Sequence, residues 1–114
     1  MQWMLFGALG GIFAGLAGFA WSAQAADEYP SRPIRLIAPA PPGTGLDLDA
    51  RAIAQRMSEL LGQPLVVENR PAAGGVVAME SAAKALPDGY TLAFAGIGAL
   101  VAFPYLYSKL PYDP

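Results

Sequence analysis

Three short apolar runs alternate with two helical patterns between residues 34 and 95, and this order restricts the chain to very few folds. The runs at 34–39, 65–69 and 90–95 have the length and composition of buried strands. Helical spacing of apolar side chains follows the first two runs, over 47–61 and 76–86. Strands joined by crossover helices pack as a parallel sheet with helices on its faces, through right-handed connections. The sequence therefore predicts an α/β fold of the order β-α-β-α-β.

The helix ends carry their own signals. Gly62 stands where a left-handed C-terminal cap is favoured, and Pro64 prevents continuation of the first helix. The turn at 87–89 ends the second helix. Asp47 opens the first helical pattern, and aspartate is a preferred N-cap residue. Asp47 is thus predicted either to cap this helix or to orient the preceding loop or a bound water.

A glycine-containing loop follows each apolar run, at 42–46, 72–75 and 96–98. The carboxyl ends of parallel strands share one edge of a sheet, and open α/β sheets bind ligands there. The first two loops also lead into helix N-termini, whose first amides lack partners and favour negative charge. We therefore expect a site for a small anion at this edge.

Nucleotide and nucleic-acid binding are not expected. After Gly43 and Gly45, the third glycine of a dinucleotide fingerprint would fall on Leu48, and the Lys-Ser/Thr pair of a phosphate-binding Walker loop is absent. The nine acidic and seven basic residues are scattered, giving a net charge of −2 and no basic stretch. Such a chain offers no electrostatic support for nucleic-acid binding.

The chain contains no histidine and no cysteine. The usual zinc ligands and the histidine of a Ser-His-Asp triad are therefore missing, so neither a metal nor another cofactor is expected. One catalytic alternative is an α/β transferase domain that uses Asp47 as a base. It lacks a plausible nucleophile and base pair, so we expect a protein that is not an enzyme.

Residues 1–26 carry no charged side chain and include an apolar stretch followed by the small residues Ser22, Ala23 and Ala25. This pattern predicts a signal peptide of residues 1–25, cleaved after Ala25. An uncleaved membrane anchor is the alternative, because the apolar run approaches the length that spans a bilayer and no basic residue precedes it. Either reading predicts export, with membrane contact only through this segment if it is uncleaved.

Six segments together resemble one family. They are Tyr29–Ile34, Pro41–Arg51, Leu61–Pro71, Gly74–Gly75, Pro87–Leu92 and Tyr107–Pro114. In this order they are similar to the Bug family, the periplasmic solute-binding receptors of tripartite tricarboxylate transporters. The resemblance implies a two-lobed α/β receptor of the type II periplasmic-binding-protein kind, of which 26–114 would be the truncated N-terminal part of lobe 1.

What the family implies for the site agrees with the edge expected above. A small organic acid would be the ligand, and membrane permease subunits would be the partners. In the family, the loops after the first and third strands meet the ligand carboxylate, largely through backbone amides and water. The candidate ligand-binding residues are Pro42, Gly43, Thr44, Gly45, Asp47, Gly74, Gly75, Ala95, Gly96 and Gly98.

Departures from the family pattern affect the expected ligand. Thr44 stands in place of a glycine, Leu46 in place of a threonine, and Val76 in place of an asparagine. Apolar residues also occupy 97, 100, 101 and 103, where polar ones are usual. These changes favour an acid with an apolar body, aromatic or branched, over a small dicarboxylate. A truncated remnant without ligand-binding activity is the alternative.

Two arginines near this edge allow more than one reading. Arg51 follows Asp47 by one helical turn, and pairs at this spacing are usually surface contacts. Arg70 could hold a carboxylate in a bidentate manner, but an arginine between a strand and a proline more often anchors the loop.

Overall fold

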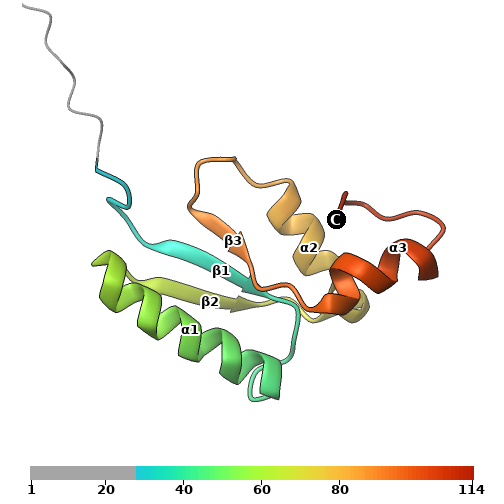
Figure 1. Ribbon diagram of the computed structural model, residues 1–114, viewed down its shortest axis with the longest axis horizontal. Coiled ribbons are helices and arrows are strands. Elements are labelled where there is room, and N and C mark those ends of the chain that lie inside the picture. Colours follow the sequence, from blue (N-terminus) through green and yellow to red (C-terminus); the bar gives the residue numbers. More distant parts are fainter. Residues whose placement is uncertain (1–27) are drawn as a thin grey trace, which may run out of the picture.

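The computed structural model describes residues 28–114 of the 114-residue chain, so the predicted signal peptide lies outside the described residues. Short helical turns accompany the main elements (Figure 1). The strands, helices and turns are, in chain order, β1 (Ile34–Ala38), α1 (Gly45–Leu61), β2 (Leu65–Asn69), η1 (Ala72–Gly75), α2 (Val76–Ala83), β3 (Thr91–Ala93), η2 (Gly98–Ala102) and α3 (Phe103–Leu106).

The three strands form a parallel sheet in the order β2-β1-β3. Ile34 pairs with Leu65 on one side of β1, and Ile37 pairs with Ala93 on the other. The chain passes through α1 to place β2 beside β1, and then through α2 to place β3 against the opposite side of β1. The predicted α/β class with a parallel sheet is therefore confirmed.

Alternate residues of β1 face two separate clusters, because successive side chains of a strand point to opposite faces. Ile34, Leu36 and Ala38 pack with Ala50 and Ala54 of α1. Ile37 faces the other cluster, which contains Ala78, Met79 and Ala99. The two helices accordingly cover opposite faces of the sheet (Figure 1). Strand β1 therefore has packed helices on both of its faces.

The first helix ends as predicted but begins earlier. Gly62 adopts the left-handed conformation, with φ 68° and ψ 9°, and its amide donates to Ser58 O over 3.0 Å. Thr44, and not Asp47, occupies the N-cap position of α1. The expectation that Asp47 caps the helix is therefore wrong. The helix starts at Gly45, two residues upstream of the predicted start, so Asp47 lies in its first turn.

Strand β2 has its predicted bounds, 65–69, but three other predicted elements extend too far. Helix α2 ends at Ala83, and Leu86 is 77% exposed instead of packing on the helix face. Pro87 explains this, because a proline disfavours helical backbone in the residue before it. Strand β3 covers only 91–93 of the predicted 90–95, and β1 ends at Ala38 before Pro39.

Two helical turns after β3 were not expected from the sequence. A single π-helical turn, η2, leads directly into the four-residue α3 near the carboxyl ends of the strands (Figure 1). The hydroxyl of Tyr112 donates to Ala99 O over 2.7 Å and fastens the last described segment to η2. Within residues 28–114, every helix is too short or too polar to cross a membrane.

Candidate functional site

The loops predicted to share one edge do so. Strand β1 lies in the centre of the sheet, so the loop that follows it lies between those that follow β2 and β3. Gly75 of η1 packs so closely against this loop that an added Cβ would be 2.6 Å from Pro39 Cβ. On the other side, the Phe94 amide donates to Ile37 O over 2.8 Å.

The strand order also creates a switch point at this edge. The connection after β1 runs to α1 on one face of the sheet, and the chain after β3 packs with α2 on the other. Adjacent parallel strands whose connections diverge leave a crevice at their carboxyl ends, where open α/β sheets bind ligands. The site predicted from the sequence thus has the expected topology.

The loop between β1 and α1 is an exposed turn with a fixed shape. The amide and hydroxyl of Thr44 both donate to Pro41 O, over 3.4 and 2.8 Å. Gly43 has φ 83°, in the region that favours glycine. Pro42, Gly43, Thr44 and Gly45 are all exposed, so this part of the predicted site is accessible.

Asp47 lies beneath the loop and does not face outward. It is 2% exposed, and both carboxylate oxygens accept hydrogen bonds from the protein. Oδ2 accepts from the Gly43 amide over 2.8 Å and from Arg51 Nε over 3.0 Å, and Oδ1 accepts from Asn69 Nδ2 over 2.7 Å. The expectation that Asp47 and Arg51 form a surface pair is therefore wrong. Asp47 is buried, and its hydrogen bonds hold the loop in place.

Asn69 is a site residue that sequence reasoning missed. Its side-chain amide donates to Ala40 O over 2.9 Å as well as to Asp47, and its oxygen accepts from Arg51 Nη2 over 3.1 Å. It thus ties β2 to both ends of the β1–α1 loop. The signal was available, because Asn69 ends the second apolar run and the first two strands of such a fold are usually neighbours.

These contacts lower the pKa of Asp47 from 3.8 to about 2. The hydrogen bond from Arg51 is the main cause, followed by those from the Gly43 amide and Asn69. Hydrogen bonds to a carboxylate stabilise its charged form. Asp47 therefore stays ionised at physiological pH and keeps the Gly43 amide engaged.

The free donors of the loop are the amides at the start of α1. Leu48 N is bonded to Thr44 O over 2.9 Å, so the amides of Gly45, Leu46 and Asp47 precede the first bonded turn. The 17-residue helix adds a partial positive charge at this end. An anion above the edge would meet these amides, whereas the Gly43 amide is already committed to Asp47.

The two predicted residues of the second loop, Gly74 and Gly75, have different environments. Gly74 is exposed, with φ 63° and open space around its Cα, so it can face a ligand. Gly75 is buried, with φ 95°, and packs against Pro39. The structure thus leaves Gly74 accessible and gives Gly75 a packing role.

The third loop brings mainly backbone groups to this edge of the sheet. Ala95, Gly96 and Gly98 are half-buried beside the start of η2, and the Ala99 amide donates to Gly96 O over 3.1 Å. Ile97 projects outward and is 80% exposed. This exposed apolar side chain lies in the loop that follows β3.

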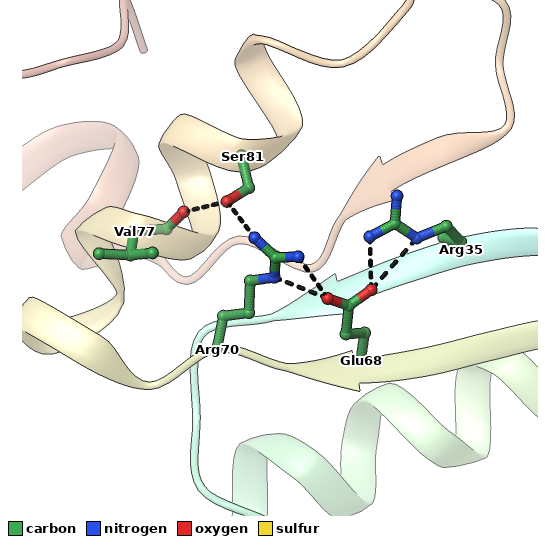
Figure 2. A network of polar contacts seen from close by, with 5 residues as sticks. All are labelled: Arg35, Glu68, Arg70, Val77 and Ser81. Carbon is green, nitrogen blue, oxygen red and sulfur yellow. Dashed lines mark hydrogen bonds and ion pairs between the residues drawn. The ribbon is translucent and has the colours of Figure 1, made fainter.

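Arg70 is turned away from the anion site. Figure 2 shows it joining β2 to α2: Nε donates to Glu68 Oε1 over 2.7 Å, and Nη1 donates to Ser81 Oγ over 2.8 Å. Glu68 also accepts two hydrogen bonds from Arg35, so Arg35 and then Arg70 lower its pKa. The interpretation of Arg70 as a structural anchor is confirmed. Among residues 28–114, no group of three or more acidic side chains could hold a metal ion.

Taken together, the fold and this edge define an α/β domain with exposed backbone amides at the switch point of a parallel sheet. The chain belongs to the tripartite tricarboxylate transporter family of receptors, whose family model matches residues 49–114. This confirms the resemblance seen in the sequence.

Individual relatives agree with this assignment. A UPF0065 protein of Bordetella pertussis is 48% identical over 91 residues, which cover 80% of this chain and 28% of the relative. MatC from Rhodopseudomonas palustris with bound malate is 39% identical, with a TM-score of 0.71, over 75% of this chain and 29% of that one. An R. palustris protein with adipate is 36% identical, with a TM-score of 0.67, over 76% and 29%. The chain therefore spans less than a third of the length of these relatives.

Proposed function

We propose that this chain forms the carboxylate-binding edge of a periplasmic solute receptor, which delivers a small organic acid to the membrane subunits of a tripartite transporter. The observation that carries the proposal is the exposed N-terminus of α1, held in place from below by the buried carboxylate of Asp47. Such an arrangement presents fixed amide donors to an anion without requiring a charged side chain.

The relatives support the ligand class. Malate and adipate, found with the two R. palustris proteins, are both carboxylates. A carboxylate has the size and charge to accept from adjacent amides at a helix start. The proposed role is binding and delivery, not catalysis.

We assign different tasks to the candidate residues. The exposed loop Pro42, Gly43 and Thr44 shapes the entrance, and Gly45 and the following amides bind the carboxylate. Gly74 and the backbone of Ala95, Gly96 and Gly98 complete the crevice, while Asp47 and Gly75 hold the loops in position.

The cellular location belongs to the same proposal. The uncharged segment 1–26 supports export with a signal peptide of residues 1–25, and 26–114 then forms part of the first receptor lobe. Membership of the receptor family supports a periplasmic location.

The direct test is a ligand panel. Malate, adipate and benzoate are added to the full chain and the melting temperature is followed, because a ligand that binds the folded state stabilises it by about 2.7 kcal/mol at 100 times its Kd. We expect stabilisation by carboxylates, with benzoate ahead of malate because of exposed apolar residues such as Ile97 and Val101. The ligand preference is wrong if malate stabilises more, and the receptor proposal is wrong if no carboxylate stabilises the chain.

One substitution tests the amide donors. Gly45→Pro removes the first amide of α1, and proline is well tolerated at the first helical position. Thr44, at φ −79° and ψ 164°, already has the extended backbone that must precede proline. We expect the Kd for the best acid of the panel to rise by about 10-fold or more, because a hydrogen bond to a charged group is lost.

Gly45→Ala is the matched control, since it keeps the amide and its Cβ would meet nothing within 4 Å. Its Kd should stay within about twofold of the wild type, because no donor is lost. Equal affinities of the proline and alanine variants, measured by calorimetry, would place the ligand elsewhere.

A further inference from the structure

A second pocket lies at the opposite edge of the sheet, where the strands begin. It is lined by Arg32, Pro33 and Arg35 from the start of β1, and by Ala85, Leu86, Asp88, Tyr90 and Thr91 from the α2–β3 connection. The length of β1, about 13 Å at 3.3 Å per residue, lies between this end of the sheet and the end with the proposed anion site. Its volume is about 270 Å³, slightly below the roughly 300 Å³ at which small-molecule pockets begin. The pocket is therefore large enough for a single acidic side chain.

One wall of this pocket is a fixed arrangement of aromatic and charged groups. The Arg32 guanidinium carbon lies 4.0 Å from the centre of the Tyr90 ring, and Arg32 Nη2 donates to Asp88 Oδ2 over 3.0 Å. Tyr90 is held in turn, because its hydroxyl accepts from the Ser31 amide over 2.9 Å and its own amide donates to Asp88 Oδ1 over 3.0 Å. The turn is also secured by the hydroxyl of Tyr29, which donates to Gly89 O over 2.6 Å.

The charges around the pocket do not balance. Arg32 pairs with Asp88, while Arg35 and Arg70 share Glu68 (Figure 2). Of these five side chains, only Arg32, Arg35 and Asp88 line the pocket, so its lining carries two positive charges and one negative charge. Among the described residues, Arg32 Nε and Nη1 and Arg35 Nη1 have no hydrogen-bond partner. One further carboxylate would balance the charge and accept from these donors.

We propose that this pocket binds an acidic side chain of a partner protein, with the carboxylate between Arg32 and Arg35. Both arginines are at least half exposed, and an exposed ion pair alone contributes little binding free energy. A free acid would therefore bind weakly, whereas a protein adds contacts around the ion pair. Leu86, which is exposed on the rim of the pocket, offers an apolar surface for such contacts.

An NMR titration of the full chain tests this inference. The probes are a capped peptide Ser-Leu-Glu-Leu-Ser, the same peptide with Gln in place of Glu, and propionate. We expect the Glu peptide to shift the Nε–Hε signals of Arg32 and Arg35, with the Gln peptide binding roughly fivefold or more weakly. Equal shifts with both peptides would overturn the proposal. Propionate that binds as tightly as the Glu peptide would overturn the choice of a protein partner.

Variants distinguish binding at this pocket from non-specific attraction between the charged peptide and the protein. Arg32→Gln combined with Arg35→Gln should weaken Glu-peptide binding by roughly five- to tenfold, whereas Lys109→Gln, an exposed residue outside the pocket, should not change it. Asp88→Asn should tighten binding by about threefold, because it frees Arg32 while the side-chain oxygen can still accept from the Tyr90 amide. The proposal fails if the double variant binds like the wild type, or if Asp88→Asn binds no more tightly than the wild type. The second variant keeps the test valid even if the first folds poorly.

Discussion

Replacing Gly75 with alanine should destabilise the protein by about 2–4 kcal/mol, the sum of a left-handed backbone penalty and overpacking. Its φ of 95° disfavours any side chain, and the new Cβ would lie 2.6 Å from Pro39 Cβ. Because Pro39 follows the central strand directly, the chain cannot move aside without disturbing β1. The change should lower the Tm by roughly 10 °C or more, measured by calorimetry or circular dichroism.

Gly74→Ala is the matched control for this prediction. Gly74 also has a positive φ, of 63°, but an added Cβ would meet nothing within 4 Å. This substitution should cost only the backbone penalty, about 1 kcal/mol of stability. The neighbouring Ala73 already adopts a positive φ, of 52°. If both alanine variants lost the same stability, close packing between η1 and the β1–α1 loop could not be the reason for the glycine at 75.

Asp47→Asn should have the second large effect, on stability and on the ligand edge together. The new side-chain NH₂ would face the Gly43 amide and Arg51 Nε, two donors that now bond to Oδ2. We expect the Tm to fall by roughly 10 °C, because the buried NH₂ would face two donors and could not accept from them, and the affinity for carboxylates to fall with it. Asp49→Asn changes an exposed acid two residues further on and should alter the Tm little.

The stability of the folded protein at acid pH should also depend on the Asp47 carboxylate. The pKa of Asp47 is lowered from 3.8 to about 2 in the folded protein, mainly by the hydrogen bond from Arg51. Its contribution to stability is therefore complete above about pH 4 and is lost as the pH falls through 2. Denaturant unfolding between pH 5 and 2 should show a weaker pH dependence for Asp47→Asn than for the wild type. Identical slopes would mean that Asp47 does not stabilise the folded state through its charge.

Much of the fold follows from local chemistry in the sequence. Gly62 marks a helix end because few other residues adopt its left-handed conformation, and the apolar runs are short enough to be strands and little else. The position of the ligand edge then follows from parallel pairing alone. What the sequence could not supply was the π-helical turn of η2, whose apolar residues at 97–103 read equally well as an extended pocket wall.

The candidate site was harder to predict where side chains meet across strands. Asp47 reads as an N-cap residue from propensity, but burial beneath the loop depends on Asn69 and Arg51, which lie 22 and 4 residues away. The direction of Arg70 also depends on contacts between elements. Its partners Glu68 and Ser81 lie on β2 and α2 and turn it away from the edge. Local pattern thus predicts which loops share the edge of the sheet, but it predicts poorly which side chains hold those loops in place.

The position of β1 between two packed helices has a consequence for the cost of binding. A strand covered on both faces is among the last segments to open, so its backbone amides should exchange with solvent only through near-global unfolding. The proposed anion-binding loop begins where this strand ends, and Asn69 fastens it to β2. Little conformational entropy is then left to lose when an acid arrives. In the proposed site, a few amides that are already held in place can therefore bind an acid at a low entropic cost.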